Sequence, residues 1–234
     1  MLYGSKRNTY EEVASIPTPA ATKTFLPISH HSFINQIATV TARQGYEITD
    51  RDYVLDNDGD RIFGVFKLKG NRADYSPLVG FRNTHDKSFS AGVCLGSQVM
   101  VCSNLSFGSD IVVFRKHTPN IQRDMYDILL NAMGQLTNKI HQQDDRYDRY
   151  KNNYLNTQFY HHMLVTAAKR KIISSSKIMK AAALWDKPEH PEFTARNMWS
   201  AFNTVTSVLK EHPNMLTINE STQRLHEHCD ALVV

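Results

Sequence analysis

The sequence predicts an α+β fold in which an N-terminal helix precedes an antiparallel β-meander and an all-helical C-terminal half. Apolar residues first recur at helical spacing just after residue 29. Runs of β-branched and aromatic residues, separated by short polar turns, then follow between residues 46 and 116. Helical periodicity returns beyond Pro119 and continues to the end. Because strands and helices are segregated along the chain, a parallel doubly wound sheet is not expected.

The composition is that of an ordinary globular protein. The chain has 234 residues, of which 41% are hydrophobic and 21% charged, so disordered and fibrous classes are excluded. No apolar run approaches the roughly 18 residues that a membrane-spanning helix requires. Three cysteines are too few for a disulfide scaffold, and the N-terminus lacks the apolar segment of a secretory signal. We therefore expect a cytoplasmic protein that does not bind membranes.

Three regions are expected along the chain. Residues 1–28 contain three prolines among scattered small polar residues and predict an extended arm with little regular structure. Residues 29–118 form a region of one helix and an antiparallel sheet. Residues 119–234 form a helical region, and the sequence leaves open whether it packs on the sheet as one domain.

The first helix is expected to start at Ser29 or Ser32, either of which can cap it, and to end before Gly45. Its buried face is formed by apolar residues at helical spacing: Phe33, Ile34, Ile37, Ala38 and Val40. Seven strand-like runs follow, at residues 46–48, 53–55, 61–68, 78–82, 89–95, 98–102 and 111–116. Turns are expected between them, including Gly96-Ser97 and Gly108-Ser109.

The acidic segment between residues 56 and 60 predicts a β-hairpin. An Asp-Gly pair between two strand-like runs favours a tight turn, because both residues tolerate positive φ. A calcium loop is the alternative, since Asp56, Asp58 and Asp60 have the spacing of the first EF-hand ligands. Gly59 stands at the fourth position instead of the sixth, however, and Lys67 stands where the bidentate glutamate is required. The hairpin is the better interpretation.

Helices are expected at residues 121–140, 157–173, 174–185, 194–210 and 218–232. Thr194 is expected to cap the fourth of these. The spacing of Trp185, Trp199, Phe202 and Val205 predicts that they are core residues.

We interpret the cysteine and histidine clusters as structural features. Cys94 and Cys102 flank the expected Gly-Ser turn, which predicts small core residues on facing strands. The segment from His226 to Cys229 could contribute two metal ligands on one helix face, but a zinc site needs one or two more. A solvated helix end with one buried cysteine is favoured instead. No metal and no cofactor are therefore predicted.

Motifs of familiar enzymes are absent from the sequence. It contains no P-loop, no dinucleotide-binding glycine fingerprint, no nucleophile elbow and no zinc-protease helix pair. No catalytic residues are predicted, and an enzyme is the less favoured class.

Polar and basic residues cluster where three expected strands end. If these strand ends lie side by side, they form a basic rim that suits phosphate oxygens. The expected nucleic-acid-binding residues of this rim are Arg82, Asn83, His85, Lys87, Asn104, Arg115, Lys116 and His117. The alternative is ordinary strand ends facing water, with Asp86 and Asp110 balancing the charge.

Lysines near residue 170 form a second basic feature. Helical spacing brings Lys169, Lys177 and Lys180 nearly into line, and such a stripe could follow a nucleic-acid backbone. A solvated helix face is the alternative. The formal net charge of +4 permits nucleic-acid binding without requiring it.

Two sequence motifs resemble a phage- and plasmid-borne family known as the domain of unknown function numbered nine-three-two. The first consists of the turn Asn83-Thr84-His85-Asp86 and the tetrad Val101-Cys102-Ser103-Asn104. The second is the helix from Trp199 to Thr206, in which Thr204 stands where alanine is usual. The resemblance spans about residues 45–215 and implies an origin in mobile genetic elements rather than a particular reaction. The order helix, meander, helix is also similar to the core of phage single-strand annealing proteins.

Three functional hypotheses follow. The first is a phage or plasmid DNA-binding protein that binds or anneals single strands in recombination or replication, as a homo-oligomer and without a cofactor. The second is an interaction protein that inhibits a host defence or replication enzyme. The third is a metal-dependent hydrolase that uses His85, Asp86 and the cluster at His226.

Overall fold

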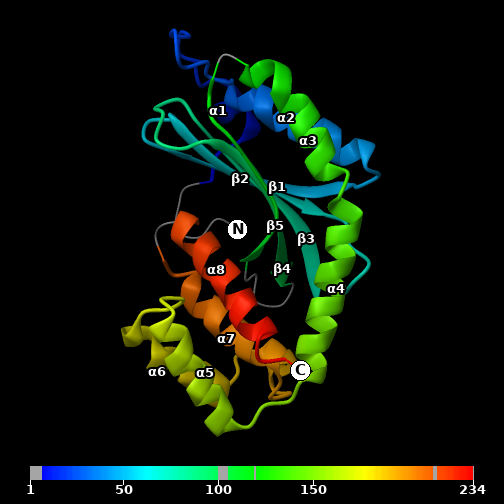
Figure 1. Ribbon diagram of the computed structural model, residues 1–234, viewed down its shortest axis with the longest axis vertical. Coiled ribbons are helices and arrows are strands. Elements are labelled where there is room, and N and C mark those ends of the chain that lie inside the picture. Colours follow the sequence, from blue (N-terminus) through cyan, green and yellow to red (C-terminus); the bar gives the residue numbers. More distant parts are fainter. Residues whose placement is uncertain (1–6, 100–104, 119, 213–214, 234) are drawn as a thin grey trace. The chain divides into compact units, whose positions relative to one another are not determined.

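The structure is a computed structural model that describes residues 7–99, 105–118, 120–212 and 215–233. The chain forms two compact units (Figure 1). Unit 1 comprises Met1–Ser97 and Ser109–Lys139, and unit 2 comprises Gln98–Gly108 and Ile140–Val234. The α+β class is confirmed, with N-terminal helices, an antiparallel sheet and a helical C-terminal half.

The sheet has five strands that lie side by side in the order of the sequence. They are β1 (Ile48–Asp56), β2 (Arg61–Leu68), β3 (Tyr75–Thr84), β4 (Ala91–Val99) and β5 (Leu105–Arg115). The described ladders, β1 with β2 and β2 with β3, are antiparallel. This arrangement confirms the predicted meander.

Two predicted turns are wrong. Strand β4 continues through Gly96-Ser97, and β5 continues through Gly108-Ser109. Small residues inside a strand can therefore resemble turn signals when the strand is long. Cys94 lies on β4, and burial raises its pKa to about 12. Cys102, with Val101, Ser103 and Asn104, lies outside the described residues.

The hairpin predicted at the acidic segment is present. Asp56 pairs with Arg61 as the last pair of the β1–β2 ladder. Asn57, Asp58 and Gly59 all have positive φ, of 53°, 54° and 93°. Left-handed backbone is least costly for Asn, Asp and Gly, which explains the composition of this turn.

The N-terminal arm contains one short helix that the sequence analysis missed, α1 (Tyr10–Ala14). The Thr9 side chain accepts a hydrogen bond from the backbone of Glu12, and the Glu12 side chain accepts one from the backbone of Thr9. This capping box satisfies two backbone donors at once. The signal was visible in the sequence as a Thr followed three residues later by a Glu.

Helix α2 (His30–Arg43) covers one face of the sheet (Figure 1). Its N-cap is Ser29, as predicted. Phe33 packs edge-on against Phe81 of β3, with ring centroids 6.5 Å apart. Phe81 also contacts Tyr53 of β1 and Phe66 of β2. These rings form the core of unit 1.

The helix expected over residues 121–140 is two helices. Helix α3 (Ile121–Met133) ends at Gly134, and α4 (Leu136–Asn152) begins two residues later. Helix α4 continues twelve residues beyond the predicted helix end at residue 140. Its first turn lies in unit 1, where the Tyr46 hydroxyl donates to Thr137 over 3.1 Å.

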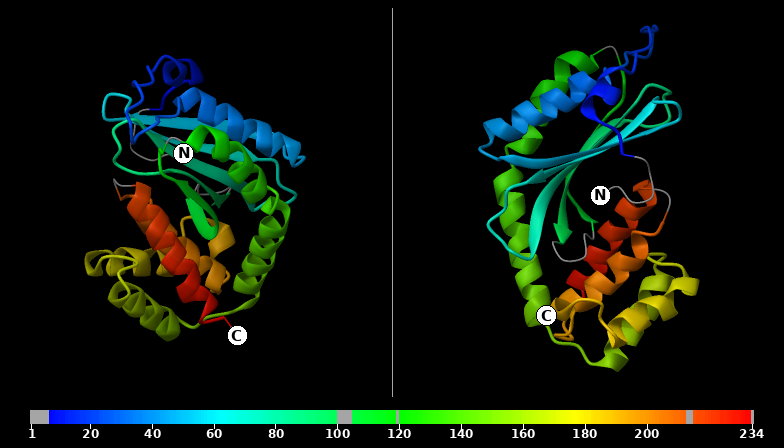
Figure 2. Two further views of the ribbon diagram at one scale, coloured as in Figure 1. Left: turned by 45° about the horizontal axis from the view of Figure 1, so that its top comes forward. Right: turned by 180° about the vertical axis from the view of Figure 1, so that it is seen from behind.

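Unit 2 contains the remaining helices, with α5 beside α6 and α7 beside α8 (Figure 2). Their bounds are α5 (Thr157–Lys169), α6 (Ile178–Asp186), α7 (Met198–Leu209) and α8 (Met215–Asp230). Short 3-10 helices, Ser175–Lys177 and Pro191–Phe193, precede α6 and α7. The predicted cap Thr194 is wrong: Asn197 caps α7 and accepts from the backbone of Ser200 over 2.9 Å.

Aromatic side chains form the core of unit 2. Trp199 is 4% exposed, and its ring lies 4.6 Å from that of Tyr147. Tyr160 stacks on Trp185 at 4.2 Å between centroids. The predicted core positions of α6 and α7 are therefore confirmed.

Candidate functional site

Strand pleating divides the residues of the predicted basic rim. Arg82 and Asn83 are adjacent on β3, so their side chains point to opposite faces of the sheet. Asn83 points to the face that α2 covers and is fully buried, whereas Arg82 is partly exposed on the other face. The prediction that both side chains form one rim is therefore wrong.

Asn83 is the centre of a buried network with three histidines. Its amide nitrogen donates to the carbonyl of Ile28 over 2.8 Å and contacts Nδ1 of His30 over 2.9 Å. Its amide oxygen accepts from Nε2 of His117 over 2.8 Å. His85 donates from Nε2 to the same Ile28 carbonyl over 3.0 Å. All these polar side chains are at most 5% exposed.

The hydrogen bonds of this histidine network fix the protonation of its rings. Nε2 of His30 faces the carbonyl of Gly59 at 2.9 Å and must donate, so its Nδ1 is free to accept from Asn83. The rings of His30 and His85 are stacked at 3.9 Å with an angle of 1° between their planes. A second proton on either ring would place a charge inside this buried stack. At His30 the second proton would also point at the Asn83 amide, so this ring is neutral.

Burial, together with the smaller effect of the neighbouring His85, lowers the pKa of both His30 and His117 to about 4. Burial also lowers the pKa of His85, against the opposing effects of the Ile28 carbonyl, Asp60 and Asp86. The network holds the segment before α2 against the end of the sheet, since Ile28 and the backbone of Leu26, which donates to His117, both belong to that segment.

Asp86 organises the turn after β3. Burial opposes its charge, but hydrogen bonds from Ser88, Thr84 and Arg61 hold the pKa of its carboxyl well below the usual range. The Arg61 guanidinium lies 2.7 Å from the carboxylate. Asp86 thus balances a basic side chain, as expected if the strand ends are not a binding site. The cation that it balances is Arg61, and the pair is partly buried.

The predicted rim residues after β5 differ in their exposure and in their partners. Arg115 forms an ion pair with Asp124 in the first turn of α3, at 2.6 Å. Lys116 is exposed, and His117 is buried in the histidine network. The ends of β3 and β5 therefore do meet, but as an internal contact. Asn104 lies outside the described residues.

The second sheet face carries a feature that the sequence analysis missed. Phe63 of β2 pairs in register with Arg82 of β3, so their side chains share this face. Phe89, just before β4, lies 5.4 Å from Phe63 between ring centroids, and the Arg82 guanidinium lies 5.1 Å from the centre of the Phe89 ring. All three side chains are partly exposed. We call these three residues the aromatic–arginine cluster.

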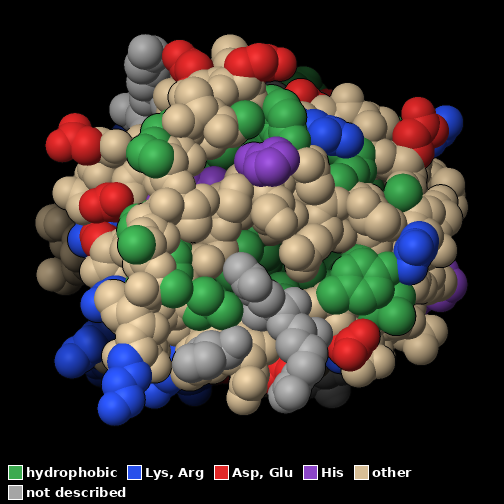
Figure 3. Space-filling model, turned by 90° about the horizontal axis from the view of Figure 1, so that it is seen from above, with side chains coloured by type: hydrophobic (Ala, Val, Ile, Leu, Met, Phe, Trp, Pro, Cys, Tyr) green, Lys and Arg blue, Asp and Glu red, His purple; other side chains and the backbone are tan. Residues whose placement is uncertain are grey.

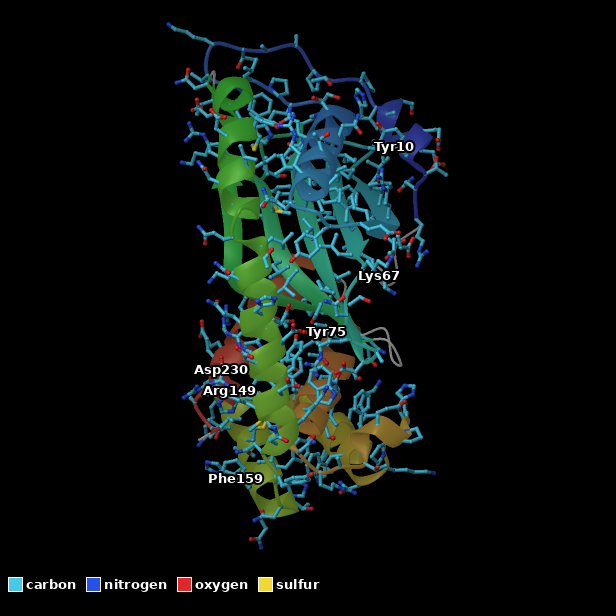
Figure 4. All side chains as sticks on the ribbon, turned by 90° about the vertical axis from the view of Figure 1, so that its right-hand side faces the viewer. Tyr10, Lys67, Tyr75, Arg149, Phe159 and Asp230 are labelled. Atoms are coloured by element: carbon cyan, nitrogen blue, oxygen red, sulfur yellow. The ribbon has the colours of Figure 1, made fainter. Side chains whose placement is uncertain are left out.

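Two lysines lie on the segments that carry the aromatic–arginine cluster. Lys87 is exposed in the turn between β3 and β4, with its ammonium 5.1 Å from the ring of Phe25. Lys67 shares the face of Phe63 because it lies four residues further along β2 (Figure 4). The period-2 spacing of Arg61, Phe63 and Lys67 was the available sequence signal. Figure 3 shows the view from above, in which several basic side chains lie together at the lower left and the others are scattered among acidic ones.

In unit 2, Lys169 and Lys177 of the predicted stripe line the same groove. Lys169 is exposed, whereas Lys177 is partly buried and pairs with Glu211 over 2.9 Å. Lys180 pairs with the same glutamate. Two of the three lysines therefore line a groove, whereas Lys180 is exposed and lies outside its lining.

The histidine segment of α8 is buried, so the predicted solvated helix end is wrong. His226 lies 4.7 Å from the ring of Phe202 and stacks near Tyr147 and Tyr150. Burial lowers its pKa to about 3 and raises the pKa of Cys229. Asp230, the last residue of α8, forms an ion pair with Arg149 of α4 at 3.9 Å (Figure 4).

Among the residues that the structure describes, no group of three or more His, Cys, Asp or Glu side chains could hold a metal ion. The residues of the hydrolase hypothesis, His85, Asp86 and His226, therefore belong to no such group. Within the described part of the chain, no helix combines the length and the apolar character needed to cross a membrane.

The fold and the site define an α+β protein of two units. The unit with the β-meander contains a buried histidine network, and the other unit is mainly helical. The family model of the domain of unknown function DUF932 matches residues 20–229. The chain belongs to this family, as the two sequence motifs indicated. No curated protein and no solved structure gives a significant match.

Proposed function

We propose that this protein binds single-stranded nucleic acid at the aromatic–arginine cluster of unit 1. The observation that carries the proposal is the spacing of Phe63, Phe89 and Arg82 on one face of the sheet. Proteins that bind single strands combine aromatic side chains, on which bases stack, with cations that follow the backbone. Both components occur here within one group of partly exposed residues.

The energetic contribution of such a cluster comes mainly from its rings. Stacking of a base on an aromatic side chain contributes about 1–3 kcal/mol and does not depend strongly on base identity. Arg82 lies over the ring of Phe89 and its Nε donates to the carbonyl of Ser90 over 3.3 Å, so the guanidinium is held where a base or a phosphate would contact it. Lys87 is exposed two residues before Phe89 and can contact the backbone of the bound strand.

The proposal changes the roles given to the other rim residues. Asn83, His85 and His117 are buried, so they position the turn and do not contact the ligand. Arg115 is engaged by Asp124 and stabilises the start of α3. Annealing, homo-oligomer formation and a role in phage or plasmid recombination or replication belong to the wider hypothesis.

Fluorescence anisotropy with a labelled single-stranded oligonucleotide tests the proposal. Salt at about 50 and 200 mM separates phosphate contacts from other contacts, because phosphate binding weakens steeply with salt. Phe89→Leu keeps an apolar side chain but removes the ring, and it is expected to weaken binding about tenfold, the equivalent of 1.4 kcal/mol. Lys87→Gln is expected to reduce the salt dependence.

Phe159→Leu is the matched control, because Phe159 is also partly exposed, at 37%, but lies on α5 in unit 2 (Figure 4). Its affinity is expected to equal that of the wild type. Thermal unfolding of each variant shows whether the fold is retained. Absence of binding by the wild type at about 50 mM salt, or equal losses for Phe89→Leu and Phe159→Leu, overturns the proposal.

A further inference from the structure

A groove of about 840 Å³ lies at one end of unit 2, where α5 and α7 end and where α6 and α8 begin. Its lining includes Val165, Ile172 and Ile178 from the first pair of helices and the turn between them, and Val208 and Leu209 from α7. The groove therefore lies within one compact unit.

The floor of the groove is aliphatic. Ile172, Val208 and Leu209 are buried, whereas Val165 is 45% exposed at its margin. The described lining contains no Phe, Tyr or Trp. Bases of a single strand stack on aromatic rings, so this floor does not suit them. Aliphatic side chains of a partner would bury apolar surface here.

The rim of the groove is basic. Lys169, Lys171 and Lys177 line it, and Glu211 is the only acidic residue in the described lining. Glu211 is already paired with Lys177 and Lys180. Lys169 and Lys171 are exposed. The net charge at the rim is therefore positive, and the two exposed ammonium groups are accessible to an anionic group.

The chain reversal after α5 holds Lys171 at the rim. Its backbone is left-handed, with φ of 57°. Its amide donates to the carbonyl of Ala168, and the amide of Ile172 donates to that of Ala167, each over 2.9 Å. This pair of bonds is the Schellman arrangement, which reverses the chain at a helix end. As a result Ile172 enters the floor and Lys171 remains exposed.

We propose that this groove is a docking site for an acidic amphipathic helix of a partner protein. The apolar side chains of that helix would lie on the aliphatic floor, and its carboxylates would pair with Lys169 and Lys171. Charge complementarity selects this occupant: the rim offers lysines, and the floor offers aliphatic surface of the kind that receives one face of a helix. The site is independent of the aromatic–arginine cluster.

Anisotropy of the full-length protein with a fluorescein-labelled model peptide tests the inference. The probe is an acidic amphipathic helix of about four turns, rich in Leu and Glu. A scrambled peptide of the same composition has the same charge but no apolar face. The wild type is expected to bind the amphipathic peptide at least about tenfold more tightly than the scrambled one.

Two variants test the two halves of the groove separately. Lys169→Glu combined with Lys171→Glu reverses the rim charge, and Val165→Asp places a carboxylate at the floor margin. Each is expected to weaken peptide binding about tenfold. The control Lys187→Glu reverses an exposed lysine outside the lining and is expected to leave affinity unchanged. Retained thermal stability excludes loss of fold.

Three outcomes would overturn the docking inference: no peptide binding, equal affinity for both peptides, or insensitivity to Val165→Asp. Displacement of the peptide by a single-stranded oligonucleotide whose own binding is lost in the double lysine variant would indicate a nucleic-acid site in this groove instead. Because Phe89→Leu leaves the groove intact, failure of one proposal does not affect the test of the other.

Discussion

The turn after β3 and the turn after α5 are both polar, but they differ in how far their side chains are exposed. In the first, residues 83–88, amide, imidazole and carboxylate groups are hydrogen-bonded inside unit 1. In the second, residues 169–177, Lys169 and Lys171 stay exposed at a groove of unit 2. Both segments contribute residues to the predicted nucleic-acid-binding set.

The difference follows from what each side chain needs. Asn83 and the histidines can each satisfy donors and acceptors with backbone groups and with one another, so they can be buried without charge. A lysine ammonium carries a full charge and three donors, and burying it requires an acidic partner. Cations in a polar motif are therefore better indicators of a binding surface than amides or neutral histidines.

The largest expected effect is the loss of Asn83. Asn83→Ala leaves His30 Nδ1 and His117 Nε2 buried without the partner that each has now. Each orphaned group costs about 1–3 kcal/mol, so the free energy of unfolding is expected to fall by about 3–5 kcal/mol. Urea unfolding at neutral pH measures the change. Asn152→Ala, an exposed position, is the control and is expected to be nearly neutral.

A loss below about 1 kcal/mol for Asn83→Ala would contradict the central role of this side chain in the network. It would also mean that the Asn83 side chain is available to contact a ligand. The comparison between the two turns would then rest on Asp86 alone.

The second expected effect is a dependence of stability on pH. His30 and His117 have pKa values of about 4 in the folded state, against about 6.5 in an unfolded chain. Between these values the unfolded chain binds more protons, so stability is complete above about pH 6.5 and falls as the pH drops toward 4. Each histidine contributes a loss of up to about 3 kcal/mol.

Unfolding by urea at several pH values between about 4.5 and 8 measures this slope. Replacing both His30 and His117 by Phe should reduce the slope, with a remaining part from the buried His85, His226 and His228, whereas replacing the exposed His31 by Ala should leave the slope unchanged. Asp86, whose folded pKa is lowered, adds its own loss only below about pH 4. An unchanged slope in the double variant would show that other groups cause the acid sensitivity.

A smaller effect is expected at the start of α3. Arg115→Ala removes an ion pair whose side chains are 37% and 25% exposed, so the expected cost is about 0.5–1 kcal/mol. Its neighbour Lys116 is exposed, and Lys116→Ala is expected to change stability by less than about 0.5 kcal/mol. Thermal melting of both variants measures the difference. Equal values would mean that the Asp124 pair contributes nothing to stability.

Much of the fold could be predicted, because it depends on local patterns. Helix α2 with its Ser29 cap, the hairpin at Gly59 and the buried Trp199 all follow from periodicity, capping and turn chemistry. The breaks that failed were those at small residues, where β4 and β5 continue. A glycine permits a turn but does not require one.

The candidate site was less predictable, because it depends on contacts between distant residues. Asn83 was predicted as a nucleic-acid-binding residue, but it is buried, and its partners His30 and Ile28 lie more than fifty residues earlier in the chain. The alternation along β3 could have separated Arg82 from Asn83, and the same alternation on β2 could have drawn attention to Phe63. Polar composition was given more weight than strand geometry.

The smallest expected effect distinguishes two neighbouring lysines of the groove. Lys171 has a left-handed backbone that glycine adopts without strain, so Lys171→Gly is expected to raise stability by about 0.5–1 kcal/mol. Lys169 lies in the last turn of α5, where Lys169→Gly is expected to lower stability by about 1 kcal/mol. Thermal melting gives both values. Opposite signs would confirm that backbone geometry at the helix end positions Lys171, whereas a loss in both variants would mean that its side chain contributes to the fold itself.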